Sequence, residues 1–234
     1  MPAQLRLYKV FKIVELPPKL PDFTYINCLS WFPNNSILLN NVKIPLFQLS
    51  PYYLKDENGC IFENLWQGSK IYSSVGKQDQ WIKNKRIWSH PAEIHIDEDG
   101  TVLSAYWPWR QKVFTNPYPV RYPNGFEGKK TCKGFITSNF QVLSYIEARK
   151  QFYVKEFARL IQLTPAFQCL KASFDSGNFN FQIADVDIPS VSSDGVSPTK
   201  ELFLKYINDP TMSFGHVWVI TALLLDWDIA ELIK

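Results

Sequence analysis

Hydrophobic residues recur at helical spacing between positions 62 and 72. Phe62, Leu65 and Trp66 occupy positions i, i+3 and i+4, which places their side chains on one side of a helix. Just before this stretch, Asn58-Gly59 is a strong signal for a tight hairpin turn. The pattern therefore predicts a turn that leads directly into an amphipathic helix.

A second stripe of the same predicted helix is polar. Glu63, Gln67 and Lys70 follow the spacing i, i+4 and i+7, so a carboxylate, an amide and an ammonium group would lie in one line. Phe62 and Trp66 flank this line, whereas a solvated helix face more often repeats Glu and Lys. Two interpretations stay open: a stripe that sits in water, or one wall of an aromatic ligand pocket.

Alternation, turn signals and helix caps predict the other elements. Residues 5–16 alternate apolar and basic positions and predict a strand, and the aromatic-rich residues 49–54 are expected to be extended. The further expected elements are a hairpin of strands 37–39 and 42–44 around Asn40-Asn41, helices 145–163, 165–176 and 198–208, a strand 179–188, and a buried helix that follows residue 216. Residues 101–140 combine aromatics with many prolines and are expected to form a long loop with short strands.

These elements predict an α+β fold, in which small β-sheets flank a helical core. A length of 234 residues fits a single domain with a sizeable core. Aromatic residues make up 15% of the chain, so many ring faces need packing partners or ligands.

Charge, cysteines and hydropathy narrow the function classes. The net charge of +3 permits an anionic ligand but does not indicate a nucleic-acid surface. The four cysteines form no C-x-x-C pair, which gives no support to a zinc site, and neither a metal nor a cofactor is expected. No secretory signal and no run of eighteen apolar residues is visible. We therefore expect an intracellular, cytoplasmic protein without a membrane span.

Two stretches that contain proline supply further candidate ligand contacts. Trp88 and His90 lie in the first, where the following proline keeps His90 out of a helix. Trp107 and Arg110 lie in the second. Aromatic residues interleaved with arginine can stack on bases or ribosyl-purine ligands, or they can merely cover a hydrophobic core. A lone histidine is more often structural than catalytic, and His95 is expected at the surface.

The C-terminal third carries two acidic residues and one histidine of interest. Asp185 and Asp187 are two positions apart at the end of a predicted strand, so both are expected on one face. Such a pair suits substrate hydroxyls, a metal or acid–base work, but it is also a common way for a strand to enter solvent. His216 stands at the start of the last helix, where either a ligand contact or a structural role is open.

The stretch around the polar stripe resembles the opening motif of the NADAR (YbiA-like) family. The family pattern is an aromatic S-x-F-Y segment, a short turn with D-G or N-G, and E-H-Y-F-Q-A-Q-K on a helix. Here Ser50-Pro51-Tyr52-Tyr53 is similar to the first part, Asn58-Gly59 to the turn, and residues 63–70 to the box. Glu, Gln and Lys fall at identical spacing and Trp66 replaces an aromatic. Asn64 stands where the family has His, so the role of that His is not carried over.

A looser resemblance lies near the C-terminus, where family members have a W-G-x-G segment that leads into a helix. Only the aromatic–glycine step at Phe214-Gly215 and the apolar helix match. The resemblance implies a NADAR-like core at about 45–75 and 140–234, with N-terminal strands in 1–44 and an aromatic, proline-rich insertion in 80–140.

The resemblance also implies a function, because family members cleave N-glycosidic bonds between a ribose and an amine or base. Glu63 would serve as the acid/base or hold ribose hydroxyls, and Gln67 would orient the sugar or a water. Lys70 would bind a phosphate or attack the opened sugar as a Schiff-base amine. The expected substrate-binding residues, which surround these three, are Tyr53, Trp66, Trp88, His90, Trp107, Arg110, Asp185, Asp187 and His216.

The expected partner is a ribosylated nucleotide or an ADP-ribosylated nucleic acid. Two other classes stay open. A nucleic-acid-binding or base-modifying protein would grip single-stranded bases with the segment 105–130, and its binding would weaken steeply with salt. A non-catalytic nucleotide-binding protein would bind ADP-ribose tightly without turnover.

Overall fold

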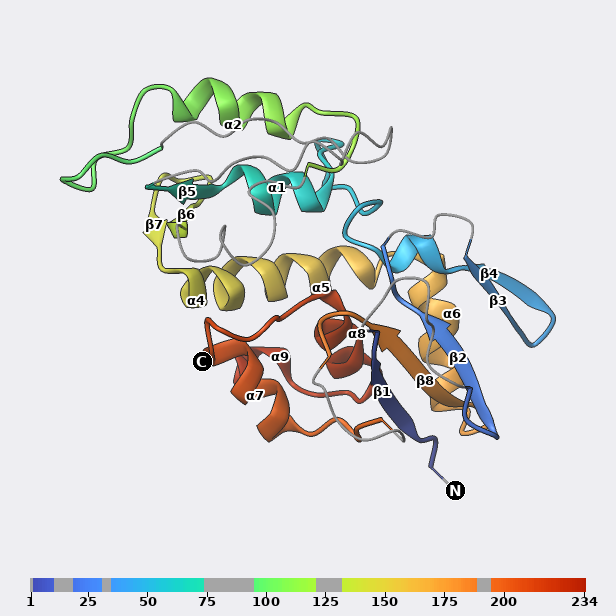
Figure 1. Ribbon diagram of the computed structural model, residues 1–234. Helices are drawn as coiled ribbons and strands as arrows, with labels where there is room; N and C mark the ends of the chain where they lie inside the picture. Colours follow the sequence, from blue (N-terminus) through green and yellow to red (C-terminus); the bar gives the residue numbers. More distant parts are fainter. Residues whose placement is uncertain (1, 11–18, 31–34, 74–94, 121–131, 189–194) are drawn as a thin grey trace. The chain divides into compact units, whose positions relative to one another are not determined.

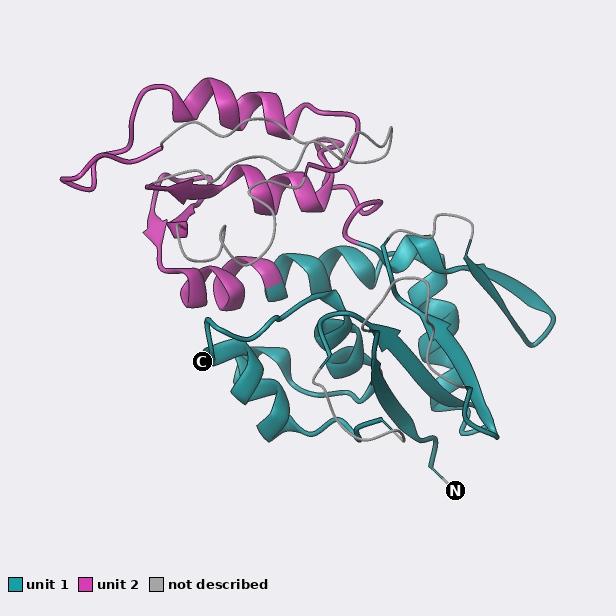
Figure 2. Cartoon of the chain, in the orientation of Figure 1, with its two compact units in different colours: residues 1–50, 154–234 teal, residues 51–153 magenta. Residues whose placement is uncertain are grey.

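The computed structural model describes residues 2–10, 19–30, 35–73, 95–120, 132–188 and 195–234 (Figure 1). These residues form helices and small sheets, which confirms the predicted α+β class. The chain divides into two compact units: residues 1–50 with 154–234 form unit 1, and residues 51–153 form unit 2 (Figure 2). The expected single domain, with its core and insertion limits, stays a prediction.

Unit 1 combines a parallel sheet, a hairpin and several helices. Its elements, in chain order, are β1 Leu5–Lys9, β2 Phe23–Asn27, β3 Ser36–Leu39, β4 Val42–Pro45, the 3₁₀ turn η1 Leu46–Leu49, α5 Lys155–Ile161, α6 Pro165–Asp175, β8 Asn180–Asp185, α7 Lys200–Asn208, α8 His216–Leu224 and α9 Ile229–Leu232. Most of these match the predicted elements, although β1 ends at Lys9 and positions 11–16 of the expected strand lie outside the described residues.

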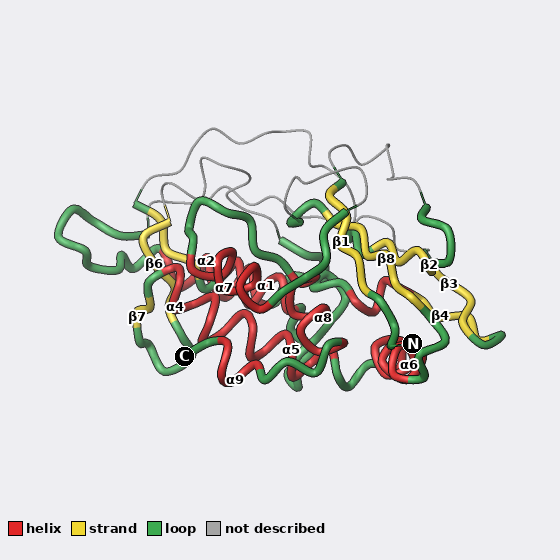
Figure 3. Tube along the Cα trace, turned by 90° about the horizontal axis from the view of Figure 1, so that it is seen from below, coloured by secondary structure: helices red, strands yellow, loops and turns green. Residues whose placement is uncertain are grey.

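The sheet of unit 1 is built around β8. This strand lies between β1 and β2 and pairs with both in parallel (Figures 1 and 3). Its residues from Phe181 to Asp185 are all buried, as expected for a central parallel strand that is covered on both faces. Asp185 therefore stands at the carboxyl end of the central strand, the edge at which parallel sheets commonly bind ligands.

Local signals in unit 1 produce the expected turns and helix starts. Asn40 and Asn41 both have positive φ, 49° and 65°, the conformation that a two-residue hairpin turn requires. Thr164 caps α6 by accepting a hydrogen bond from the Phe167 backbone N–H, with Pro165 in the first helical position. Thr199 caps α7 in the same way.

Unit 2 holds the segment with the polar stripe. Its elements are α1 Phe62–Gly68, β5 Lys70–Tyr72, α2 Tyr106–Phe114, β6 Cys132–Ile136, β7 Val142–Leu143, α4 Tyr145–Ala148 and the π-helical turn η2 Arg149–Val154, whose last residue belongs to unit 1. The strands form an antiparallel sheet in the order β5-β6-β7. Ser144 and Glu147 form the predicted capping box at the start of α4.

The expected helix over 62–72 is wrong at its C-terminal end. The helix ends at Gly68, and Lys70–Tyr72 forms β5, which pairs with β6. A Cβ at Gly68 would lie 2.8 Å from the Phe114 ring, so the glycine lets α1 and α2 approach closely. Tertiary pairing therefore overrides the helical spacing at Lys70. The expectation that 49–54 is extended is also wrong, because η1 and a turn occupy this segment.

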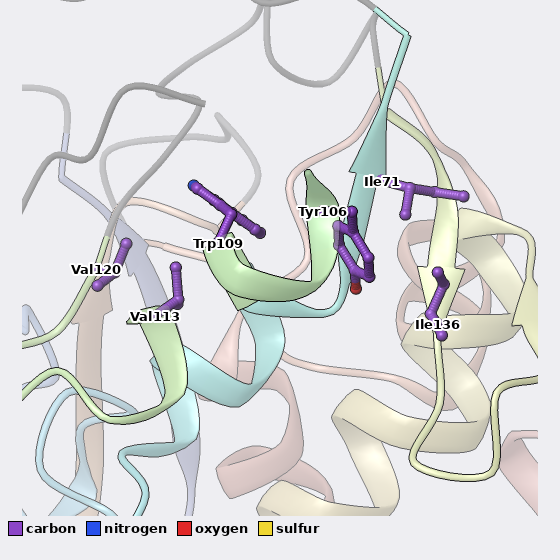
Figure 4. Packing of buried hydrophobic residues seen from close by; sticks show 6 residues of the cluster. All are labelled: Ile71, Tyr106, Trp109, Val113, Val120 and Ile136. Atoms are coloured by element: carbon purple, nitrogen blue, oxygen red, sulfur yellow. The ribbon is translucent and has the colours of Figure 1, made fainter. Parts of the chain in front are cut away.

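The expected long loop over 101–140 is wrong for its first part. Residues 106–114 form α2 although Pro108 lies inside it. The proline occupies the third helical position, where a backbone N–H has no intrahelical acceptor, so the helix loses no hydrogen bond. The side chains of Tyr106, Trp109 and Val113 are buried together with Ile71 and Ile136 (Figure 4).

His95 contradicts its expected surface position, since its side chain is fully buried. The ring lies 4.4 Å from that of Trp109 and 5.1 Å from that of Tyr106, measured between centroids. Neither ring nitrogen has a hydrogen-bond partner of normal geometry among the described residues. Burial lowers the pKa of His95 to about 4, and the Lys70 backbone carbonyl opposes this only in part.

This burial predicts a pH-dependent stability. Between the ordinary histidine pKa of 6.5 and the folded value of about 4, the unfolded chain binds a proton that the folded chain does not. The stability contributed by neutral His95 is therefore complete above pH 6.5 and is lost as the pH falls toward 4, by roughly 3 kcal/mol at most. In the His95→Phe variant, we expect the free energy of unfolding to fall less steeply than in the parent protein as the pH is lowered over this range. Urea denaturation of both proteins at several pH values checks this, and equal pH slopes would contradict it.

Candidate functional site

The turn before α1 fixes where the helix starts. The Asp56 carboxylate accepts hydrogen bonds from the backbone N–H groups of Asn58 and Cys60, at 3.1 and 2.8 Å, and Gly59 adopts φ 78°. The Phe62 N–H then donates to the Leu54 carbonyl at 2.8 Å. The predicted turn is therefore present and anchors the first turn of α1, which carries Glu63.

The three polar side chains of the stripe form one hydrogen-bonded chain. Gln67 Nε2 donates to Glu63 Oε1 at 2.8 Å, and Lys70 Nζ donates to Gln67 Oε1 at 3.1 Å. Glu63, Gln67 and Lys70 retain only 7%, 8% and 9% of their exposed surface. The interpretation as a solvated stripe is therefore wrong. The predicted concave pocket beside the stripe stays a prediction.

Aromatic rings enclose this chain on one side. Lys70 Nζ lies 4.6 Å from the centroid of the Trp66 ring and 5.8 Å from that of Tyr145, close enough for cation–π attraction to both. The Trp66 ring packs in turn on Phe135 at 5.2 Å and lies parallel to Phe152 at 6.4 Å. Lys70 thus contacts Gln67 and Trp66 of α1 although it lies in β5 and not in the helix.

Asn64, which replaces the histidine of the family motif, has a structural position. Its side chain is fully buried. Nδ2 donates to the carbonyls of Asn116 and Tyr118 at 3.0 and 3.1 Å, and Oδ1 accepts from the Val120 N–H at 2.6 Å. Asn64 therefore holds the segment that follows α2 against α1.

The other candidates of unit 2 make contacts of their own or lie outside the described residues. Trp107 is 38% exposed on α2 and packs edge-on against Phe140. Arg110 donates to the carbonyls of Ile136 and Thr137 at 3.3 Å. Tyr53 lies in the turn before α1 and is partly exposed. Their roles in substrate binding stay predictions, as do those of Trp88 and His90, which lie outside the described residues.

The acidic pair and His216 lie in unit 1. Asp185 ends β8, whereas Asp187 lies in the following turn, so the expectation of two acids on one strand face is wrong. The chain bends because the Asp185 carboxylate accepts the Asp187 backbone N–H at 2.9 Å. A Cβ at Gly215 would lie 2.2 Å from Asp187 Oδ2, so this carboxylate packs against the start of α8.

His216 and Asp185 form a buried polar contact at the same edge of the sheet. His216 Nε2 lies 2.9 Å from the Cys28 backbone oxygen and 3.6 Å from Asp185 Oδ2. Burial, aided by the nearby Asp185 carboxylate, raises the pKa of the Cys28 thiol. Cys28 is therefore a poor nucleophile here, and the contact anchors α8 to the carboxyl end of β2.

Two residues beside the hydrogen-bonded chain were missed by sequence reasoning. Tyr145 lies next to Trp66, with ring centroids 5.9 Å apart, and the Arg149 guanidinium carbon lies 4.6 Å from the Tyr145 ring centroid. Arg149 is 1% exposed. Their spacing of four residues in a predicted helix was the available signal, but it does not reveal that an arginine on this helix is buried.

No protein-family model, curated protein or solved structure matches this chain. Among the described residues, no cluster of three or more His, Cys, Asp or Glu side chains is arranged to hold a metal ion. None of the helices in the described parts of the chain is long and apolar enough to cross a membrane.

Asn64 provides a test of the scaffold around the chain. In Asn64→Asp, a carboxylate would face two carbonyls and could donate to neither, so we expect the free energy of unfolding to fall by roughly 3 kcal/mol or more. The matched control is Asn178→Asp at an exposed position, which should change it by less than about 0.5 kcal/mol. Chemical denaturation measures both, and similar effects in the two variants would contradict the assigned role.

Proposed function

We propose that this protein is a hydrolase that cleaves the N-glycosidic bond between a ribose and an amine or base in a ribosylated or ADP-ribosylated nucleotide. The observation that carries the proposal is the buried chain of Glu63, Gln67 and Lys70 against the Trp66 ring. The resemblance of this segment to the NADAR motif supports it independently, because the three residues that form the chain are the ones that match the motif.

Glu63 supplies the chemistry that such a cleavage needs. Positive charge develops on the sugar as the bond breaks, and a buried carboxylate stabilises it more strongly than one in water. When protonated, the same group can deliver a proton to the leaving nitrogen. The Gln67 amide, which donates to Glu63 Oε1, holds the carboxyl group in place for this role.

Lys70 offers two roles that experiment can separate. As a protonated amine it donates to Gln67 and lies over Trp66, and from there it can bind a phosphate of the substrate. As a neutral amine it can attack C1 of the ribose, so that the bond from C1 to the base breaks and the base leaves with a proton. The bond from C1 to the ring oxygen then opens to give a protonated Schiff base, which water hydrolyses to release the sugar and the lysine. Trp66 contributes an aromatic face for the leaving base in either case.

The first prediction concerns Glu63→Gln. The variant keeps the acceptor for Gln67 but removes the negative charge and the transferable proton, so we expect single-turnover cleavage to slow by about 10²–10⁴-fold. Ligand affinity should change little. Cleavage is followed by mass spectrometry on a panel of ribosylated nucleotides and ADP-ribosylated DNA, and affinity by calorimetry.

The matched control for this experiment is Glu156→Gln, which alters a carboxylate that pairs with Arg159 on the surface of α5. It should retain the parent rate. Full activity in Glu63→Gln would remove Glu63 from the mechanism, and the absence of cleavage of every substrate by the folded parent protein would refute the proposed function.

The second prediction concerns Lys70→Met, which keeps an apolar stem over Trp66 but removes the ammonium group. If Lys70 only binds a phosphate, affinity falls and bound substrate still reacts. If it forms a Schiff base, turnover is lost and borohydride traps a covalent adduct in the parent protein but not in the variant. Intact-protein mass spectrometry reads the adduct, and unchanged affinity and rate would exclude both roles.

A further inference from the structure

The proposed cleavage makes two chemical demands at the same moment. Positive charge develops on the sugar while the leaving nitrogen takes up a proton. A carboxyl group stabilises the charge when it is ionised, but it can donate a proton only when it is protonated. Glu63 therefore cannot meet both demands at once. Active sites commonly divide such roles between two groups in different surroundings, so a second group beside Glu63, Gln67 and Lys70 would complete the site.

Tyr145 is the first residue of α4, and local hydrogen bonds fix where it stands. The Ser144 hydroxyl accepts the Glu147 backbone N–H at 3.2 Å, and the Glu147 carboxylate accepts the Ser144 backbone N–H at 2.8 Å. This capping box starts the helix at Tyr145. Helix α4 packs against β6, whose Phe135 ring lies 5.2 Å from the Trp66 ring, measured between centroids. The fold thus brings Tyr145 to the proposed site.

The Tyr145 ring borders the proposed site beside Lys70. Its centroid lies 5.9 Å from that of the Trp66 ring and 5.8 Å from Lys70 Nζ. The guanidinium carbon of Arg149 lies 4.6 Å from the same centroid. Cation–π attraction to these groups favours one position of the ring, so the ring is held in place before a ligand binds.

Tyr145 is more open to solvent than the residues of the hydrogen-bonded chain. Glu63, Gln67 and Lys70 are nearly buried, as is Trp66, whereas Tyr145 is only partly buried. Its hydroxyl makes no hydrogen bond to any of the described residues, and it does not belong to their buried polar atoms that lack a partner. The phenolic O–H therefore reaches solvent and can donate to a ligand that binds beside Lys70.

We propose that Tyr145 donates the proton to the leaving amine or base, while Glu63 is ionised and stabilises the sugar. This inference rests on the proposed function and adds a catalytic residue to it. As the bond from C1 to the leaving nitrogen breaks, the nitrogen keeps the electron pair and takes the phenolic proton. The water that supplies the new hydroxyl group of C1 returns a proton to the phenolate. Lys70 keeps either of its two roles.

The test compares substrates that share a sugar but differ in the leaving group. The pairs are ADP-ribosylated DNA with NAD, and adenosine monophosphate with nicotinamide mononucleotide. Nicotinamide leaves as a neutral molecule without a proton, whereas the amine or base of the other substrate needs one. We expect Tyr145→Phe to slow single-turnover cleavage of the proton-requiring substrate by about 10²-fold or more. Cleavage of the nicotinamide substrate should change by less than about twofold, and affinity, measured by calorimetry, should change little.

Two further variants serve as controls. Glu63→Gln should slow both members of a pair, because both need negative charge near the sugar. Tyr118→Phe removes the hydroxyl group of another exposed tyrosine in unit 2 and should retain the parent rates. Tyr145→Phe keeps the ring and loses only a hydroxyl group without a hydrogen bond to a described residue, so it should fold like the parent protein, which circular dichroism checks.

Several outcomes would overturn the inference while the proposed function stands, because the parent protein still cleaves. Tyr145→Phe could slow both members of a pair equally, which is the signature of a structural tyrosine, or it could slow neither. A dependence on the leaving group in Glu63→Gln, with none in Tyr145→Phe, would assign the proton transfer to Glu63. Cleavage of the nicotinamide substrates alone would leave no proton to donate. If the folded parent protein cleaves none of the four substrates, the proposed function and this inference both fall.

Discussion

The direction of the hydrogen bonds between Glu63, Gln67 and Lys70 is the constraint on which the candidate site depends. An ammonium can only donate and a carboxylate can only accept, so the amide between them has a single satisfactory orientation, with Nε2 toward Glu63 and Oε1 toward Lys70. The opposite orientation would place donor against donor and acceptor against acceptor. Because all three side chains are nearly buried, water cannot repair such a mismatch. The chain is therefore held in one arrangement before any ligand arrives.

The same constraint explains which parts of the site were visible in the sequence. Glu63 and Gln67 lie four residues apart in a helix, and their contact follows directly from that spacing. Lys70 does contact Gln67, as predicted, but not through helical spacing, because α1 ends at Gly68 and Lys70 begins β5. A long side chain on the first residue of a strand reaches the last turn of the preceding helix, so the hydrogen bond survives the change of structure. Tyr145 and Arg149 could not be found in this way, since their approach to Lys70 depends on how α4 packs against β6.

Other differences between expectation and structure also arise where tertiary contacts decide. Helix caps and turns are local, and Asn40-Asn41, Thr164 and the Ser144–Glu147 box all took the predicted form. Burial is not local, and neighbouring residues gave no sign that His95 would lie among the rings of Trp109 and Tyr106. The density of prolines in 101–140 was likewise misleading, because Pro108 falls in the first turn of α2, where it is tolerated.

His95 also shows how burial affects a charged group in unit 2. Its pKa of about 4 reflects its burial among aromatic rings, which disfavours the charged imidazolium. Lys70 follows Gly68 and Ser69 at the start of β5, and its own backbone carbonyl is the group that partly offsets this effect on His95. Lys70 Nζ donates to Gln67 Oε1 and lies over the Trp66 ring, and the Arg149 guanidinium lies over the Tyr145 ring, so these contacts help to stabilise both cations. Low polarity around Glu63 would also strengthen the attraction between its carboxylate and a cationic sugar. The burial of Glu63, which makes its charge costly, would therefore make that charge more effective in catalysis.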